Sequence, residues 1–131
     1  MPKPAATKEQ VEAVRERIIR ETISLISACG FSGFSMRKLG SRLGVAAKTI
    51  YNYFSDKDEL YLSVLAKGFA QLRKRLTQAR DPQTAPVEAL RNMARAYVGF
   101  GLENPHYYNV LFNMDLPRFV DLYDSCRSNR L

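Results

Sequence analysis

A glycine between two short helical patterns is the feature that most constrains the fold of this chain. Ser35 is placed to act as an N-cap, because a serine hydroxyl can accept a hydrogen bond from an amide in the first turn of a helix. The next residues predict a two-turn amphipathic helix with apolar side chains at i, i+3 and i+7: Met36, Leu39 and Leu43. Gly44 is expected to end this helix.

A second short helix is predicted directly after the turn, over Ala47–Tyr53. Ile50 and Phe54 share one face of it, because residues four apart lie above one another on a helix. The remaining side chains are free to point elsewhere: Lys48, Thr49, Asn52 and Tyr53. A helix, a glycine-containing turn and a second helix thus follow one another, as in a helix-turn-helix.

A longer helix is predicted before this unit. Apolar residues recur at helical spacing from Val14 to Cys29, and charged residues such as Arg15 lie off that stripe. Cys29 is interpreted as a small core residue, and Gly30 as a left-handed stop. The preceding residues, 1–7, are expected to form a mobile tail.

Another long helix is predicted after the unit. Asp56 and Glu59 have the spacing of a capping box, so this helix should begin near Lys57 and run to about Arg80. Its apolar positions are Leu60, Val64, Leu65, Phe69, Leu72 and Leu76.

Prolines divide the rest of the chain. Pro86 can occupy the first turn of a further helix, which Asn104-Pro105 interrupts. Helical patterning restarts over residues 107–112, and a last short helix is expected over residues 119–123 after Leu116-Pro117. No segment shows the period-two alternation of strands, so the predicted fold class is all-α.

The net charge of +7 lies in the first half of the chain. Residues 1–57 carry +5, residues 58–80 carry +3 and residues 81–131 carry −1. The net charge favours attraction to polyanions, among them nucleic acid and anionic membranes, and its distribution places the positive field in the first half of the chain.

Several function classes find no support in the sequence. Cys29 and Cys126 lie far apart without metal-ligand spacing, which argues against a zinc site and a disulfide framework. No nucleophile–base pairing or phosphate-binding glycine loop indicates an enzyme, and no cofactor is expected. No signal peptide or membrane-spanning stretch is apparent, so we expect a cytoplasmic protein that does not enter a membrane.

The order and spacing of these residues resemble the N-terminal domain of TetR-family transcriptional repressors. The resemblance covers about residues 14–65 and is far more specific than a bare helix-turn-helix pattern. It is carried by Gly30-Phe31, by Phe34 to Gly40, by Leu43 to Phe54 and by Lys57 to Leu60. It implies a bacterial, three-helix DNA-binding head whose partner is double-stranded operator DNA.

The resemblance implies five base-reading positions: Arg37, Ala46, Ala47, Lys48 and Asn52. The two alanines are small enough to let the helix enter the major groove closely, and lysine commonly reads guanine acceptors. Asn52 either bonds adenine or faces solvent, and Arg37 either contacts DNA or is a solvated surface arginine.

Five further positions match those that hold the sugar-phosphate backbone in the family: Ser35, Thr49, Tyr51, Tyr53 and Lys57. For Tyr53 the alternative is a half-buried aromatic, and Tyr51 either packs under the recognition helix or reaches a phosphate. Two departures stand out. Ala46 lacks the capping hydroxyl common in relatives, at a cost on the order of 1 kcal/mol, and Gly40 replaces a frequent alanine.

The second half of the chain resembles the beginning of a TetR-type regulatory domain, from Arg95 to Phe112. In relatives such helices line a cavity for small apolar or aromatic effectors. The resemblance therefore implies six pocket candidates: Tyr97, Phe100, His106, Tyr107, Phe112 and Met114. Ordinary core packing is at least as good an interpretation of each one.

The predicted organisation is a tail and helix-turn-helix head over residues 1–56, followed by a linker helix and partial regulatory domain over residues 57–131. The predicted function is that of a homodimeric repressor released by a small-molecule effector. The alternative is a constitutive DNA-binding module that acts through a protein partner. Family members run to about two hundred residues, so the regulatory domain is either unusually short or represented here without its pairing helices.

Overall fold

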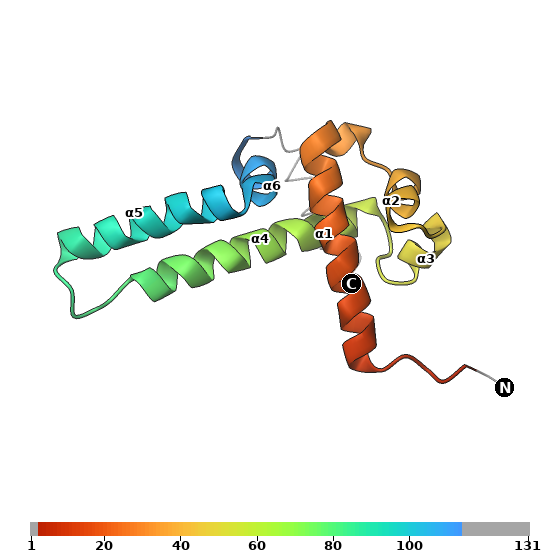
Figure 1. Ribbon diagram of the computed structural model, residues 1–131, viewed down its shortest axis with the longest axis horizontal. Coiled ribbons are helices and arrows are strands. Elements are labelled where there is room, and N and C mark those ends of the chain that lie inside the picture. Colours follow the sequence, from red (N-terminus) through yellow and green to blue (C-terminus); the bar gives the residue numbers. More distant parts are fainter. Residues whose placement is uncertain (1–2, 114–131) are drawn as a thin grey trace, which may run out of the picture.

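The computed structural model describes residues 3–113, and every regular element within them is helical. The elements are α1 (Lys8–Gly33), α2 (Met36–Leu43), α3 (Ala47–Tyr51), α4 (Lys57–Ala79), α5 (Pro86–Glu103), α6 (Pro105–Tyr108) and the π-helical turn η1 (Asn109–Asn113). Figure 1 shows α1 crossing α4, with α2 and α3 beside each other near this crossing and α5 running back along α4. The prediction of an all-α fold is confirmed.

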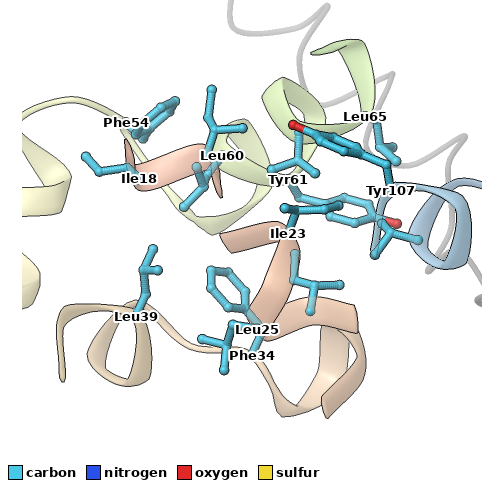
Figure 2. Packing of buried hydrophobic residues seen from close by; sticks show 14 of the residues in the cluster. Ile18, Ile23, Leu25, Phe34, Leu39, Phe54, Leu60, Tyr61, Leu65 and Tyr107 are labelled. Atoms are coloured by element: carbon cyan, nitrogen blue, oxygen red, sulfur yellow. The ribbon is translucent and has the colours of Figure 1, made fainter. Parts of the chain in front are cut away.

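One hydrophobic core runs from the helix-turn-helix to α6. Buried residues from all the longer helices meet in it, and Figure 2 shows its centre, where side chains of α1 and α4 pack together with Phe34 and Tyr107. Phe34 is 2% exposed and Tyr61 is 1% exposed. The first half of α4 therefore belongs to the core that supports α2 and α3, and α6 adds to the same core from the other side.

The first helix begins earlier than its apolar stripe predicts. The Thr7 hydroxyl accepts a hydrogen bond from the Gln10 amide (3.2 Å), and the Gln10 side chain accepts one from the Thr7 amide (2.9 Å). This capping box starts α1 at Lys8 rather than near Val14. Gly30 has the positive φ expected of it (73°) together with a non-helical ψ (168°), so the regular helix stops there, and a further short helical stretch follows across the kink.

The prediction that Cys29 is a small core residue is wrong. Its side chain is exposed, and its thiol donates a hydrogen bond to the Leu25 carbonyl at 3.0 Å. The residue lies in the last turn before the Gly30 kink, beyond Ile26, which is the last buried residue of α1. Cys126 lies outside the described residues.

The second helix has the predicted bounds and the predicted ends. The Ser35 hydroxyl accepts a hydrogen bond from the Lys38 amide at 3.1 Å, and Gly44 adopts the left-handed conformation (φ 71°, ψ 28°). Gly44 leads straight into the turn before α3. Its positive φ is the reason for glycine there, because other residues enter this region at a cost.

The later helices follow the predicted breaks. Pro86 is the first residue of α5, and Pro105 is the first residue of α6 after the interruption at Asn104. Gly68 lets α6 and η1 approach α4, because a β-carbon there would lie 2.8 Å from Cδ1 of Tyr107. The short helix predicted over residues 119–123 lies outside the described residues.

Candidate nucleic-acid interface

The recognition helix α3 is short and is held from one side. Ile50 (0% exposed) and Phe54 (1%) anchor it in the core, as their spacing predicts. The helix ends at Tyr51, two residues before the predicted end, and Asn52 and Tyr53 continue as a turn in which the Tyr53 amide donates to the Ile50 carbonyl (2.9 Å). Side chains on the opposite side of α3 are consequently left to solvent.

The N-terminal end of α3 lacks a side-chain cap. Ala46 has the extended conformation of an N-cap residue (φ −69°, ψ 149°), but its methyl group accepts no hydrogen bond. The departure noted in the sequence is thus a real feature of the structure. A serine in that place would usually accept a bond from one of the first amides of the helix.

The predicted base-reading positions lie at the surface of α2 and α3. Four of them are exposed and Ala47 is half-buried: Arg37, Ala46, Ala47, Lys48 and Asn52. Within residues 3–113, neither Arg37 nor Lys48 takes part in an ion pair. Their positive charges are therefore available to an anionic partner.

The predicted backbone-contacting positions are at least partly accessible, although Tyr53 also packs against the core as the half-buried aromatic of its alternative interpretation. Tyr51 is 49% exposed, so it does not pack under the recognition helix. The other four are half-buried: Ser35, Thr49, Tyr53 and Lys57. For Ser35 the N-cap role uses the hydroxyl oxygen as an acceptor, which leaves the hydroxyl hydrogen free to donate.

Lys57 is held over two aromatic rings. Its ammonium lies 4.3 Å from the ring centroid of Phe31 and 5.4 Å from that of Phe34. Such cation–π contacts contribute about 0.5–1 kcal/mol at exposed sites. They restrict the long lysine side chain at the start of α4 without neutralising its charge.

Glu59, in the first turn of α4, forms hydrogen bonds with two residues of the connection between α3 and α4. Its amide donates to the Asp56 carboxylate at 2.7 Å, as a capping box requires, but its own carboxylate binds the hydroxyl and amide of Ser55 rather than the amide of Asp56. The Ser55 hydroxyl, then its amide, lowers the pKa of the Glu59 carboxyl, while burial opposes this and the charge of Arg15 assists it. The predicted box is thus confirmed in one half and displaced by one residue in the other.

The contact of Arg15 with the turn after α3 was not predicted from the sequence. Its guanidinium donates to the Tyr53 carbonyl at 2.5 Å and lies 4.3 Å from the ring centroid of Phe54. The two partners are far from Arg15 in sequence, and the only sequence signal was that Arg15 lies off the apolar stripe. That signal also fits any solvated arginine.

Acidic residues of α1 offset part of the positive charge of the other helices. Arg42 of α2 pairs with Glu21 at 3.4 Å, and Lys67 of α4 pairs with Glu16. Burial lowers the pKa of Lys67, while nearby Glu12 raises it. The paired cations lie toward α1, whereas Arg37 and Lys48 are on the helices that present the predicted reading surface.

Within residues 3–113, the candidate pocket residues divide between the core, the surface and an aromatic cluster. Phe100 (0% exposed) and Tyr107 (8%) lie in the core, and His106 is exposed with its Nδ1 atom 3.2 Å from the Ser27 hydroxyl. Tyr97 and Phe112 contact each other in a wider aromatic cluster with Phe69 and Tyr108. Met114 lies outside the described residues.

The aromatic cluster adjoins open grooves. Tyr97 and Tyr108 line one of about 290 Å³ together with Val98, Gly101 and Leu102. A second, of about 430 Å³, lies along the C-terminal half of α4 and is lined by Phe69, Leu72, Arg73, Leu76, Thr77, Arg80 and Met93. Within residues 3–113, no three histidine, cysteine or acidic side chains gather into a metal site, and no helix there has the length and hydrophobicity of a membrane span.

Comparison with protein families matches residues 18–64 to the family described as bacterial regulatory proteins, tetR family. The matched segment contains the second half of α1, all of α2 and α3, and the beginning of α4. It therefore coincides with the part of the chain that builds the surface described above.

Similar proteins support the same assignment. The HTH-type transcriptional regulator Rv1816 of Mycobacterium tuberculosis is 27% identical over 114 residues, covering 86% of this chain and 47% of the relative. The chain thus spans about half the length of the curated relatives it matches.

Two solved structures extend the likeness to the fold. A TetR-like regulator from Rhodococcus sp. RHA1 superimposes with a TM-score of 0.77 and 21% identity, covering 96% of this chain and 66% of that one. A TetR-family regulator from Haemophilus influenzae does so with a TM-score of 0.69 and 30% identity, covering 86% and 62%. Both likenesses run beyond the helix-turn-helix into the helices that follow it.

Proposed function

The chain belongs, through its helix-turn-helix domain, to the TetR family of bacterial regulatory proteins, and on this premise we propose that it is a sequence-specific DNA-binding repressor of transcription. One observation carries the proposal. The short helix α3 is anchored by Ile50 and Phe54, while Lys48 on it and Asn52 directly after it are exposed. Within residues 3–113, Lys48 takes part in no ion pair. This is the arrangement that a groove-entering helix requires.

The exposed residues divide into readers and anchors in this proposal. Ala46 and Ala47 allow close approach to the major groove, where Lys48 reads guanine acceptors and Asn52 reads adenine. Arg37, exposed in the first turn of α2, contacts a base edge or a flanking phosphate.

The anchors fix the register of the head on the duplex. The hydroxyls of Ser35, Thr49, Tyr51 and Tyr53 donate to phosphate oxygens, and Lys57 supplies a positive charge. Because these groups bind backbone rather than base edges, they contribute affinity for any sequence. Sequence discrimination falls to the reading residues alone.

The proposed active form is a homodimer. Two heads of this kind bind half-sites of a near-palindromic operator about 34–36 Å apart. A small apolar or aromatic effector releases the operator by binding more tightly to a state in which the two heads no longer fit this spacing. The groove beside Tyr97 and Tyr108 is the proposed contact for such an effector, and the cytoplasm is the proposed location.

A constitutive DNA-binding module is the second candidate. It is favoured by the position of Phe100 and Tyr107, which fill the core and are not available to line a pocket. Thermal unfolding against a panel of apolar aromatic compounds separates the two, since a ligand at a hundred times its Kd stabilises the native state by about 2.7 kcal/mol. A compound that raises Tm and weakens operator binding supports the responsive repressor.

The central experiment is selection of bound duplexes from a random pool, followed by binding titrations at physiological salt. We expect an operator preferred over a scrambled duplex by at least about 10³-fold. Lys48→Ala should reduce this ratio, whereas Lys74→Ala, which removes an exposed charge near the C-terminal end of α4, should leave it unchanged. Equal affinity for selected and scrambled duplexes would falsify the proposal.

A further inference from the structure

The contact between α1 and the turn after the recognition helix points to a residue that acts without reading DNA. Arg15 donates one N–H to the Tyr53 carbonyl at 2.5 Å and stacks over Phe54 at 4.3 Å. Tyr53 is itself a proposed phosphate anchor. The guanidinium therefore holds, from α1, the backbone of a residue that is proposed to contact DNA.

The recognition helix has unusually little to hold its ends. It is five residues long, and no side chain caps its N-terminus at Ala46. The turn that follows α3 contains the Tyr53 carbonyl, which lies two residues beyond the last helical residue, Tyr51. Arg15 donates to this carbonyl from a different helix, so the turn directly after α3 is fixed by tertiary contact.

A second clamp acts on the same connection. The Glu59 carboxylate binds the hydroxyl and amide of Ser55, two residues after Tyr53, and the charge of Arg15 helps to keep that carboxylate ionised. The turn between α3 and α4 is thus bonded to α1 through the Tyr53 carbonyl and to α4 through Ser55. Each of these hydrogen bonds involves a charged side chain, and together they restrict the conformations open to the turn.

We propose that Arg15 is a positioning residue, which sets the orientation of the turn directly after α3 and of Tyr53 for DNA binding. The inference rests on the proposed function above. It assigns Arg15 an effect on affinity that comes from pre-organisation of the free protein, because a turn that is already ordered loses less conformational freedom on binding.

Direct phosphate binding is the competing explanation, because the guanidinium carries five N–H donors and one of them serves Tyr53. The two roles differ in salt dependence. Each phosphate contact adds close to one unit to the slope of log K against log salt concentration, whereas a positioning contact adds none.

The first arm of the test uses the free protein and no DNA. Amide hydrogen exchange is compared for the wild type, Arg15→Met, Arg15→Lys and Arg17→Met, the last being a matched exposed arginine on the same helix. Arg15→Met should lower protection of the Tyr53 and Phe54 amides by about tenfold or more, while amides of α4 such as that of Val64 stay unchanged. Arg15→Lys should recover most of the protection, because an ammonium can also donate to the carbonyl.

The second arm uses the operator obtained by selection. Arg15→Met should weaken binding by about tenfold at every salt concentration, with an unchanged salt slope, and Arg17→Met should bind like the wild type. A slope lower by about one unit would make Arg15 a phosphate ligand and overturn the inference. So would unaltered exchange at Tyr53 and Phe54, or an equal loss of protection throughout the protein.

The two arms keep this inference separate from the proposed function. Wild-type protein without any sequence preference would refute both the function and the DNA-binding consequence of Arg15. The exchange arm would still establish whether Arg15 orders the turn. A wild type that prefers its operator, with Arg15→Met indistinguishable from it in both arms, would refute the inference alone.

Discussion

Gly40 and Val45 approach each other so closely that a β-carbon on Gly40 would lie 2.6 Å from the Val45 carbonyl oxygen. The Val45 amide also donates to the Gly40 carbonyl at 2.9 Å. Helix propensity alone would favour alanine over this glycine by about 1 kcal/mol. The close approach of α2 to the turn thus explains a glycine that the sequence pattern showed only as a departure.

Gly40→Ala is expected to destabilise the protein by about 1–3 kcal/mol, because the atoms that must move are backbone atoms of the turn before α3. The measurement is the free energy of unfolding in urea. Ser41→Ala, a substitution at the next position that also raises helix propensity, is the control and should be neutral or stabilising. A stabilised Gly40→Ala variant would show that the turn can yield at no cost.

Ala46→Ser is expected to stabilise the free protein by about 0.5–1 kcal/mol, since a serine hydroxyl in this extended N-cap conformation can accept from the first amides of α3. The shift in Tm measures it. Ala47→Ser places the same hydroxyl inside the helix, where it cannot cap, and should produce no gain. Equal shifts for both variants would contradict the capping explanation.

The helices themselves could largely be predicted from local pattern. The bounds of α2, the stop at Gly44 and the start of α5 at Pro86 follow from signals within a few residues, because capping groups, glycine and proline act on the nearest turns. The early start of α1 at Lys8 was missed because its cap, Thr7, precedes an exposed first turn without an apolar stripe. Cys29 was misplaced because it continues the apolar stripe at helical spacing, whereas burial of α1 ends at Ile26.

The exposed residues of the candidate interface could be predicted from the sequence, but the tertiary contacts that hold them in place could not. Lys48 and Asn52 were found because their neighbours Ile50 and Phe54 fix which face is buried. The contact of Arg15 could not be predicted, because its partner Tyr53 lies 38 residues away in sequence and comes close only when the chain folds. For Phe100 the local pattern left pocket lining and core packing both open, and the fold buries it completely.

Lys48→Ala and Lys57→Ala are expected to affect different properties of DNA binding, the first sequence discrimination and the second overall affinity. Lys48→Ala should relax discrimination at one base-pair position, where wrong pairs cost about 1–3 kcal/mol in the wild type. Lys57→Ala should weaken binding to all duplexes about equally and lower the salt slope by about one unit. Titrations against operator variants over a salt series check both, and matching effects from the two substitutions would refute the division into reader and anchor.

The same pair is expected to differ in stability without DNA. Lys57→Ala removes the cation that lies over Phe31 and Phe34, at a cost of about 0.5–1 kcal/mol. Lys48 is exposed, so Lys48→Ala should change the free energy of unfolding by less than about 0.5 kcal/mol. Urea unfolding of both variants measures the difference, and identical curves would show that the aromatic contacts contribute nothing.

Glu59 should make the stability of the protein fall in acid. The hydrogen bond from the Ser55 hydroxyl, followed by that from the Ser55 amide, lowers the pKa of its carboxyl from the ordinary value of 4.5. A lowered folded-state pKa stabilises the native state above the unfolded-state pKa, and this contribution is lost as pH falls through the folded-state pKa. The advantage of wild type over Glu59→Gln should therefore be complete above about pH 5 and shrink steadily below it. Urea unfolding at a series of pH values above and below about 5 measures that advantage. The control is Asp58→Asn, which removes an exposed carboxylate from the same helical turn. If the difference between wild type and Glu59→Gln stays constant as the pH falls, the carboxylate's charge contributes nothing to the Ser55 clamp.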